Sequence, residues 1–84
     1  MAKETVIQGV VVRDGQPVGG AYVRLLDSTG EFTAEVPTSA TGQFRFFAAP
    51  GTWTVRTLTP GATVDSTVVA SQGEVAELDV ALPA

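Results

Sequence analysis

The chain has 84 residues, 44% of them hydrophobic, which suits one small folded domain and excludes a disordered chain. It contains no cysteine and no histidine, which excludes disulfides, thiolate chemistry, histidine-based catalysis and the usual transition-metal ligand sets. Its net charge of −4 has the wrong sign for a surface that binds nucleic acid.

Glycine and proline interrupt the chain at short intervals, which leaves room for strands and little room for helices. The segments between these breaks are rich in Val, Thr, Phe and Leu, which suit a pleated and half-buried surface. The pattern predicts about seven strands. In chain order they are residues 4–13, 21–27, 32–36, 43–48, 52–58, 63–70 and 75–82.

Alternation along these segments predicts which side chains face inward, because successive residues of a strand point to opposite faces. In the first segment both rows are apolar, with Val6, Val10 and Val12 on the second row. That strand is either covered on both faces or carries an exposed apolar stripe. The predicted core consists of Val23, Leu25, Phe44, Phe46, Trp53, Val55, Leu78 and Val80.

No repeat, low-complexity tract or linker divides the sequence, so we expect residues 1–84 to form one domain. Closely spaced turns and alternating strands predict an all-β fold, an antiparallel two-sheet sandwich. The sequence shows neither a charged-then-apolar leader nor an apolar run of about 18 residues. We therefore expect a cytoplasmic chain that makes no membrane contact.

Three blocks in order, residues 9–25, 41–46 and 50–55, resemble the carboxypeptidase-regulatory-like repeat. This resemblance implies a single domain with a transthyretin-like sandwich, also described as prealbumin-like or Ig-like. The blocks also have a local physical rationale. Asp14-Gly15 is typical of a tight reversal with positive φ at glycine, and Thr41-Gly42 and Pro50-Gly51 bracket a strand with turns.

The chain is similar, nearly letter for letter in places, to a small actinobacterial family often labelled SseC-like. The matching segments are residues 3–7, 23–28, 31–36 and 44–54. Genes of that family lie beside thiosulfate sulfurtransferase genes. The resemblance implies an accessory role in sulfur metabolism, with a sulfurtransferase as a candidate partner.

The sequence offers no recognisable catalytic set. A serine nucleophile needs a positioned base, and the chain has no histidine to activate Ser28, Ser39, Ser66 or Ser71. Its acidic side chains fall at turns or on outer strand faces, where solvation explains them better than glycoside hydrolysis does. We therefore expect no enzyme activity, no cofactor and no bound metal.

The outward-facing rows of the strands are the most informative part of the surface. We predict an interaction surface made of Tyr22, Arg24, Leu26, Arg45, Phe47 and Arg56. The three arginines on one sheet could hold a small oxyanion such as sulfate or thiosulfate, because each presents a planar fork of donors. Alternatively they pair across strands with Asp27, Glu31, Glu35 or Asp65.

A mixture of aromatic residues, arginine and leucine is also typical of protein interfaces. The leading hypothesis is therefore a non-catalytic accessory module that binds a protein, either a sulfurtransferase or a second copy of itself. A small-oxyanion-binding protein is the alternative.

Overall fold

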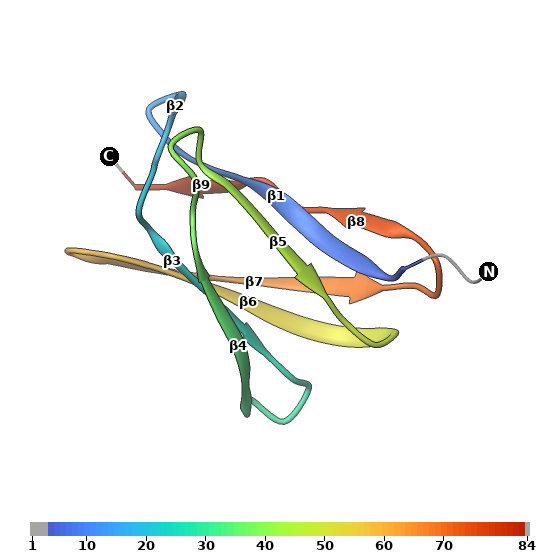
Figure 1. Cartoon of the computed structure of the whole chain (residues 1–84). Coiled ribbons are helices and arrows are strands. Elements are labelled where there is room, and N and C mark those ends of the chain that lie inside the picture. The colour runs from blue at the N-terminus through green and yellow to red at the C-terminus, as the bar shows by residue number, and fades with distance from the viewer. Residues whose placement is uncertain (1–3, 84) are drawn as a thin grey trace.

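A computed structural model describes residues 4–83 as two β-sheets packed face to face (Figure 1). No segment of this range forms a helix that is long and apolar enough to cross a membrane. The strands are β1 (Val6–Arg13), β2 (Gln16–Pro17), β3 (Tyr22–Leu26), β4 (Phe32–Pro37), β5 (Gln43–Phe47), β6 (Gly51–Thr59), β7 (Ala62–Ala70), β8 (Val75–Glu77) and β9 (Val80–Leu82).

The first sheet is built around β1, which pairs antiparallel with β2 and β5 and parallel with β8 and β9. The second sheet has the order β4-β3-β6-β7 and is antiparallel throughout. The predicted all-β sandwich is therefore confirmed. Strands β8 and β9 depart from the antiparallel pattern, because they pair parallel with β1 and make the first sheet mixed. Alternation in the sequence predicts which face of a sheet each side chain lies on. The direction of β8 and β9 relative to β1 depends instead on how the chain crosses from β7 into the other sheet.

The predicted strands correspond to β1 and β3–β7 with ends shifted by one or two residues, while β2 was not predicted. The last predicted strand is split into β8 and β9 at Leu78 and Asp79. There the backbone N–H of Leu78 donates to the carbonyl of Gln8 at 2.8 Å, and the N–H of Val10 donates to the Asp79 carboxylate at 3.3 Å. The Asp79 side chain thus replaces a backbone partner where the ladder is interrupted.

The core lies between the sheets and contains most of the predicted residues. Trp53 and Leu78 are less buried than the other predicted core residues, because both lie at the edge of the core and pack against it. Trp53 faces inward as predicted, and its indole N–H donates to the carbonyl of Ala49 at 2.9 Å. The other predicted core residues are buried, and they are Val23, Leu25, Phe44, Phe46, Val55 and Val80.

The reversal between β1 and β2 has the predicted geometry. Arg13 pairs with Gln16 across a two-residue turn in which Asp14 has φ 51° and Gly15 has φ 76°. Positive φ at both central positions matches the twist of the flanking strands, and Asp and Gly tolerate it.

Candidate interaction surfaces

The six predicted surface residues do not form one surface, because they lie on the outer faces of two different sheets. The structure places Tyr22, Arg24, Leu26 and Arg56 on the four-stranded sheet, and Arg45 and Phe47 on the five-stranded sheet. The prediction of one surface is therefore wrong, because Arg24 lies on the opposite face of the sandwich from Arg45 and Phe47. Local alternation shows that a side chain points outward, but sheet membership decides its neighbours.

A row of charged residues crosses the four-stranded sheet. Register places Arg24 opposite Glu35 on one side and opposite Arg56 on the other. Arg56 in turn lies opposite Asp65 and binds it through two hydrogen bonds, Nε to Oδ1 at 2.8 Å and Nη2 to Oδ2 at 3.0 Å. The row is therefore balanced, with two guanidiniums between two carboxylates.

The Arg56–Asp65 contact has the two-pronged geometry of a strong ion pair. The Arg56 guanidinium holds the pKa of Asp65 below its usual value through this hydrogen bond, and Asp65 raises the pKa of Arg56. Arg24 Nε lies 3.6 Å from Glu35 Oε1, which is too long for a hydrogen bond, and has no other hydrogen-bond partner in residues 4–83. Cross-strand pairing with Glu35 and Asp65 is confirmed. The three-arginine anion site is wrong, because Arg45 lies on the other sheet.

Asp27 stabilises its own turn and does not pair with an arginine. Its Oδ1 atom accepts hydrogen bonds from the Thr29 N–H at 2.9 Å, the Thr29 hydroxyl at 2.6 Å and the Glu31 N–H at 3.0 Å. The hydroxyl of Thr29, followed by the N–H of Glu31, lowers the pKa of Asp27. This carboxylate is a turn residue in the β3–β4 connection.

Leu26 is on the outer row as predicted, but it is only 5% exposed and cannot be a contact residue. A β-bulge in the β3–β4 pairing brings Phe32 directly opposite Leu26, and Thr54 flanks it on the other side. Phe32 itself is exposed, as is Tyr22 at the other end of β3. Alternation along β4 groups Phe32 with the inward-facing Ala34 and Val36, and only the bulge places Phe32 on the outer face.

On the five-stranded sheet, an apolar row crosses three strands. Val6 of β1 lies opposite Phe47 on one side and Val75 on the other. Phe47 is 66% exposed and Val75 is 53% exposed, while Val6 between them is 7% exposed. Val6 is buried yet lies outside the core cluster, and its direct cross-strand neighbours on both sides are apolar. At this position, the second apolar row of β1 is buried at Val6 and continues onto the neighbouring strands as two exposed side chains, Phe47 and Val75.

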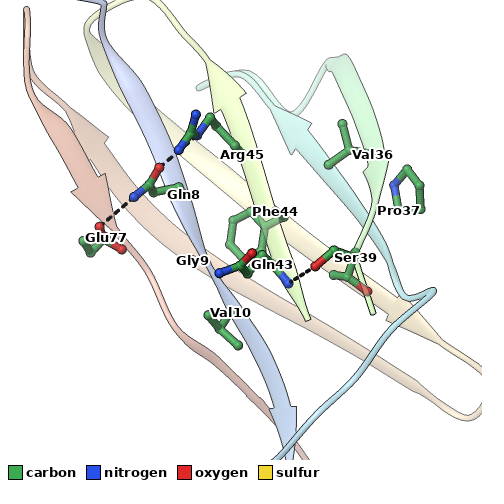
Figure 2. A pocket seen from close by; sticks show the side chains of 11 residues that line it. Gln8, Gly9, Val10, Val36, Pro37, Ser39, Gln43, Phe44, Arg45 and Glu77 are labelled. Carbon is green, nitrogen blue, oxygen red and sulfur yellow. Dashed lines mark hydrogen bonds between the residues drawn. The ribbon is translucent and has the colours of Figure 1, made fainter. Parts of the chain in front are cut away.

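A row of hydrogen-bonded polar side chains, the polar ladder, runs parallel to this apolar row, two residues further along β1 (Figure 2). Arg45 Nε donates to Gln8 Oε1 at 3.0 Å, and Gln8 Nε2 donates to Glu77 Oε1 at 2.8 Å. Register places these three residues directly opposite one another. The ladder therefore holds the Arg45 side chain across the sheet, next to the apolar row.

The ladder forms one wall of a cleft of about 570 Å³ around strand β5 (Figure 2). Val36 and Pro37 of β4 lie across from it, and Phe44 contributes apolar surface. Ser39 lines the same cleft, and its hydroxyl accepts a hydrogen bond from the backbone N–H of Gln43 at 3.1 Å. The cleft combines apolar walls with a few oriented polar groups, as small binding sites do.

Within residues 4–83, no group of three or more acidic side chains is placed to hold a metal ion. The four serines lie at turns or in strand β7, and Ser39 is engaged with Gln43 and within 3.2 Å of the Thr41 hydroxyl. Lys3, the only lysine in the sequence and therefore the only one that could act as a base for a serine, lies outside the described residues.

Solved structures with the same fold come from proteins of different kinds. The dioxygenase domain of a dioxygenase and carbohydrate-binding fusion protein from Streptomyces sp. SirexAA-E has a TM-score of 0.73 at 14% identity, covering 96% of this chain and 80% of that chain. BcpA, the major pilin subunit of Bacillus cereus, has a TM-score of 0.72 at 15% identity, covering 95% of this chain and 29% of that chain. At such low identity the likeness shows the β-sandwich fold alone.

Relatives of similar sequence come from mycobacteria. The uncharacterized proteins Rv0814c and Rv3118 of Mycobacterium tuberculosis are each 60% identical over 81 residues, which is 95% of this chain and 81% of each relative. An uncharacterized protein of Mycolicibacterium smegmatis is 59% identical over 95% of this chain and 90% of its own length. A family model described as "Protein of unknown function (DUF1416)" matches residues 1–82. With this match and these relatives, the chain belongs to the DUF1416 family.

Proposed function

We propose that this chain is a non-catalytic module that binds another protein through the outer face of its five-stranded sheet. The observation that carries this proposal is the apolar row, in which Phe47 and Val75 are exposed on either side of the buried Val6. Large apolar side chains grouped in the open, next to polar ones, are typical of interaction sites.

The neighbouring residues support the same role. Interfaces that bind tightly combine an apolar anchor with an oriented polar rim, and aromatic and arginine side chains are enriched in them. Here Phe47 would be the anchor, and the ladder through Arg45 and Gln8 supplies donors and acceptors whose positions are already set. Little side-chain freedom would be lost when a partner binds this ladder.

The partner to test first is a thiosulfate sulfurtransferase, on the strength of the resemblance to the SseC-like family. In this role the chain is an accessory component of sulfur metabolism in the cytoplasm. The contact that the proposal names is the apolar row and not the balanced charge row on the opposite face. That distinction makes the proposal testable with single substitutions.

The test compares Phe47→Ser with Tyr22→Ser, an exposed aromatic on the other sheet. Each protein would be immobilised and presented with a purified thiosulfate sulfurtransferase and, separately, with an extract of an actinobacterium. The unmodified chain and Tyr22→Ser should retain the same protein, whereas Phe47→Ser should weaken its binding about tenfold or more. Both variants should unfold at nearly the same urea concentration as the unmodified chain, because surface changes usually alter stability by less than about 0.5 kcal/mol.

Two results would count against the proposal. Retention of the same proteins by Phe47→Ser would show that the apolar row is not the binding surface. Binding of extract proteins through Phe47, without any sulfurtransferase among them, would keep the binding role and remove the sulfur-related partner.

A further inference from the structure

Strand β7 forms one edge of the four-stranded sheet. It is nine residues long and pairs with β6 along its whole length without a register shift. Among residues 4–83, no hydrogen bond connects β7 to any element other than β6. Figure 1 shows the β6–β7 hairpin extending past the other strands at its turn. Strand β7 therefore presents a long, regular and unpaired edge.

The other edges carry features that hinder the addition of a further strand. Strand β4 contains a β-bulge and ends at Pro37. Strand β5 has only five residues, and both backbone groups of Gln43 are occupied by Ser39. Strands β8 and β9 have three residues each and are interrupted between them. Short strands, bulges and proline are the devices by which natural sheets prevent edge-to-edge pairing.

Strand β7 has none of these devices. It contains no proline and no bulge, and its single charged residue, Asp65, is neutralised by Arg56. A long, undistorted edge whose single charge is already paired is a template for another strand.

The alternation of an antiparallel ladder shows which backbone groups are free. Ala62 pairs with Thr59 across the two-residue turn at Pro60-Gly61, so its N–H and C=O point toward β6. The same holds for every second residue after it. The groups that point away from β6 therefore belong to Thr63, Asp65, Thr67 and Val69.

We infer that β7 pairs antiparallel with β7 of a second copy of this chain, about a two-fold axis at Ser66, joining two four-stranded sheets into one of eight strands. In this register Asp65 lies opposite Thr67 of the second copy, so the two Asp65 carboxylates do not face each other. Val64 likewise lies opposite Val68 of the second copy. All outward-pointing backbone groups then meet one another as hydrogen-bonded pairs.

Side-chain burial on β7 fits this arrangement. Val64 and Val68 pack against the core but remain half-buried, because the sheet ends beside them. Val69 is largely exposed on the outer face. Cross-strand pairing with the second copy would cover part of each of these valines, and such apolar pairs stabilise a sheet. A second copy of this chain fits the edge because, in this register, valine faces valine and the two Asp65 carboxylates do not face each other.

A charge substitution at Thr67 tests both the pairing and its register, because Thr67 faces Asp65 of the second copy twice in each dimer. Sedimentation velocity at increasing protein concentration should show dimers of the unmodified chain. Thr67→Asp places like charges opposite each other and should raise the dissociation constant about tenfold. Thr67→Lys places opposite charges there and should leave the dissociation constant equal or lower. Thr33→Asp, an exposed threonine on β4, is the matched control and should not change it.

Monomers at every concentration up to about 1 mM, where even a weak complex would form, would overturn the inference. If Thr67→Asp and Thr67→Lys raised the dissociation constant of the dimer equally, Thr67 would not face Asp65 of the second copy. The inferred register, and with it the inference, would be overturned. The inference is independent of the proposed function, since Phe47→Ser should leave the dimer intact. If Phe47→Ser abolished the dimer and Thr67→Asp did not, the chain would self-associate through the apolar row. That result would also overturn the inferred β7–β7 pairing.

Discussion

The carbonyl oxygen of Leu78 occupies the position that a Cβ atom on Gly9 would need. Gly9 is buried in the middle of β1, at the interruption between β8 and β9, and the ring of Phe44 approaches within 3.0 Å of the same position. Gly9 has no unusual φ, so the requirement for glycine is one of space. The close approach of two backbones across the first sheet depends on this one missing side chain.

Gly9→Ala should therefore destabilise the chain at or beyond the upper end of about 1–3 kcal/mol, the usual cost of overpacking, because backbone must move to relieve the clash. Urea denaturation followed by tryptophan fluorescence would measure the loss. Gly61→Ala is the control, since open space surrounds Gly61 and only its positive φ of 80° opposes a side chain. If the two variants lose equal stability, the contact with Leu78 is not the limiting one.

Trp53 is half-buried at the rim of the core, and its indole N–H bonds to the carbonyl of Ala49. Trp53→Ala should cost about 2–4 kcal/mol, somewhat less than the 3–5 kcal/mol of an enclosed aromatic, because part of the ring already contacts water. Trp53→Phe keeps most of the packing and should lose about 1 kcal/mol through the missing hydrogen bond. A loss below about 1 kcal/mol for Trp53→Ala, measured by chemical denaturation, would contradict its place in the core.

Thr57 is completely buried on β6, and its hydroxyl has no hydrogen-bond partner among residues 4–83. Thr57→Val replaces this hydroxyl with a methyl group of similar shape, so the free energy of unfolding should stay equal or rise by up to about 1 kcal/mol. Thr57→Ser is the matched variant, because it keeps the hydroxyl and removes the methyl group. It should lose about 0.8 kcal/mol. If Thr57→Val melted at a lower temperature than Thr57→Ser, the hydroxyl of Thr57 would have a hydrogen-bond partner in solution.

The Arg56–Asp65 pair predicts a pH dependence of stability. The pKa of Asp65 is lowered in the folded chain, so its contribution is complete above the unfolded value of about 3.9 and is lost as pH falls through the folded pKa. Asp65→Asn should destabilise the chain at neutral pH by less than about 1 kcal/mol, because the pair is exposed. The unmodified chain and the variant should converge in strongly acidic solution. A difference in unfolding free energy that does not change with pH would contradict an ionised pair.

Local patterns in the sequence were sufficient for most of the strands, though not for the short β2 or the break between β8 and β9, and for the direction of most side chains. Alternation around Val23 and Val55 identifies the buried face, because one face of a packed sheet must be apolar. Asp14-Gly15 likewise predicts its own turn, since the required positive φ is a property of these residue types. Such features depend only on neighbours within a few positions of the chain.

Sheet membership, register and the neighbours of each outward side chain were decided by the tertiary structure. Arg24 and Arg45 have the same local pattern but lie on opposite faces of the sandwich, because β3 and β5 join different sheets. Leu26 points outward and is still buried, because a bulge brings Phe32 beside it. A strand's period of two assigns each residue to a face, whereas long-range pairing determines what else lies on that face.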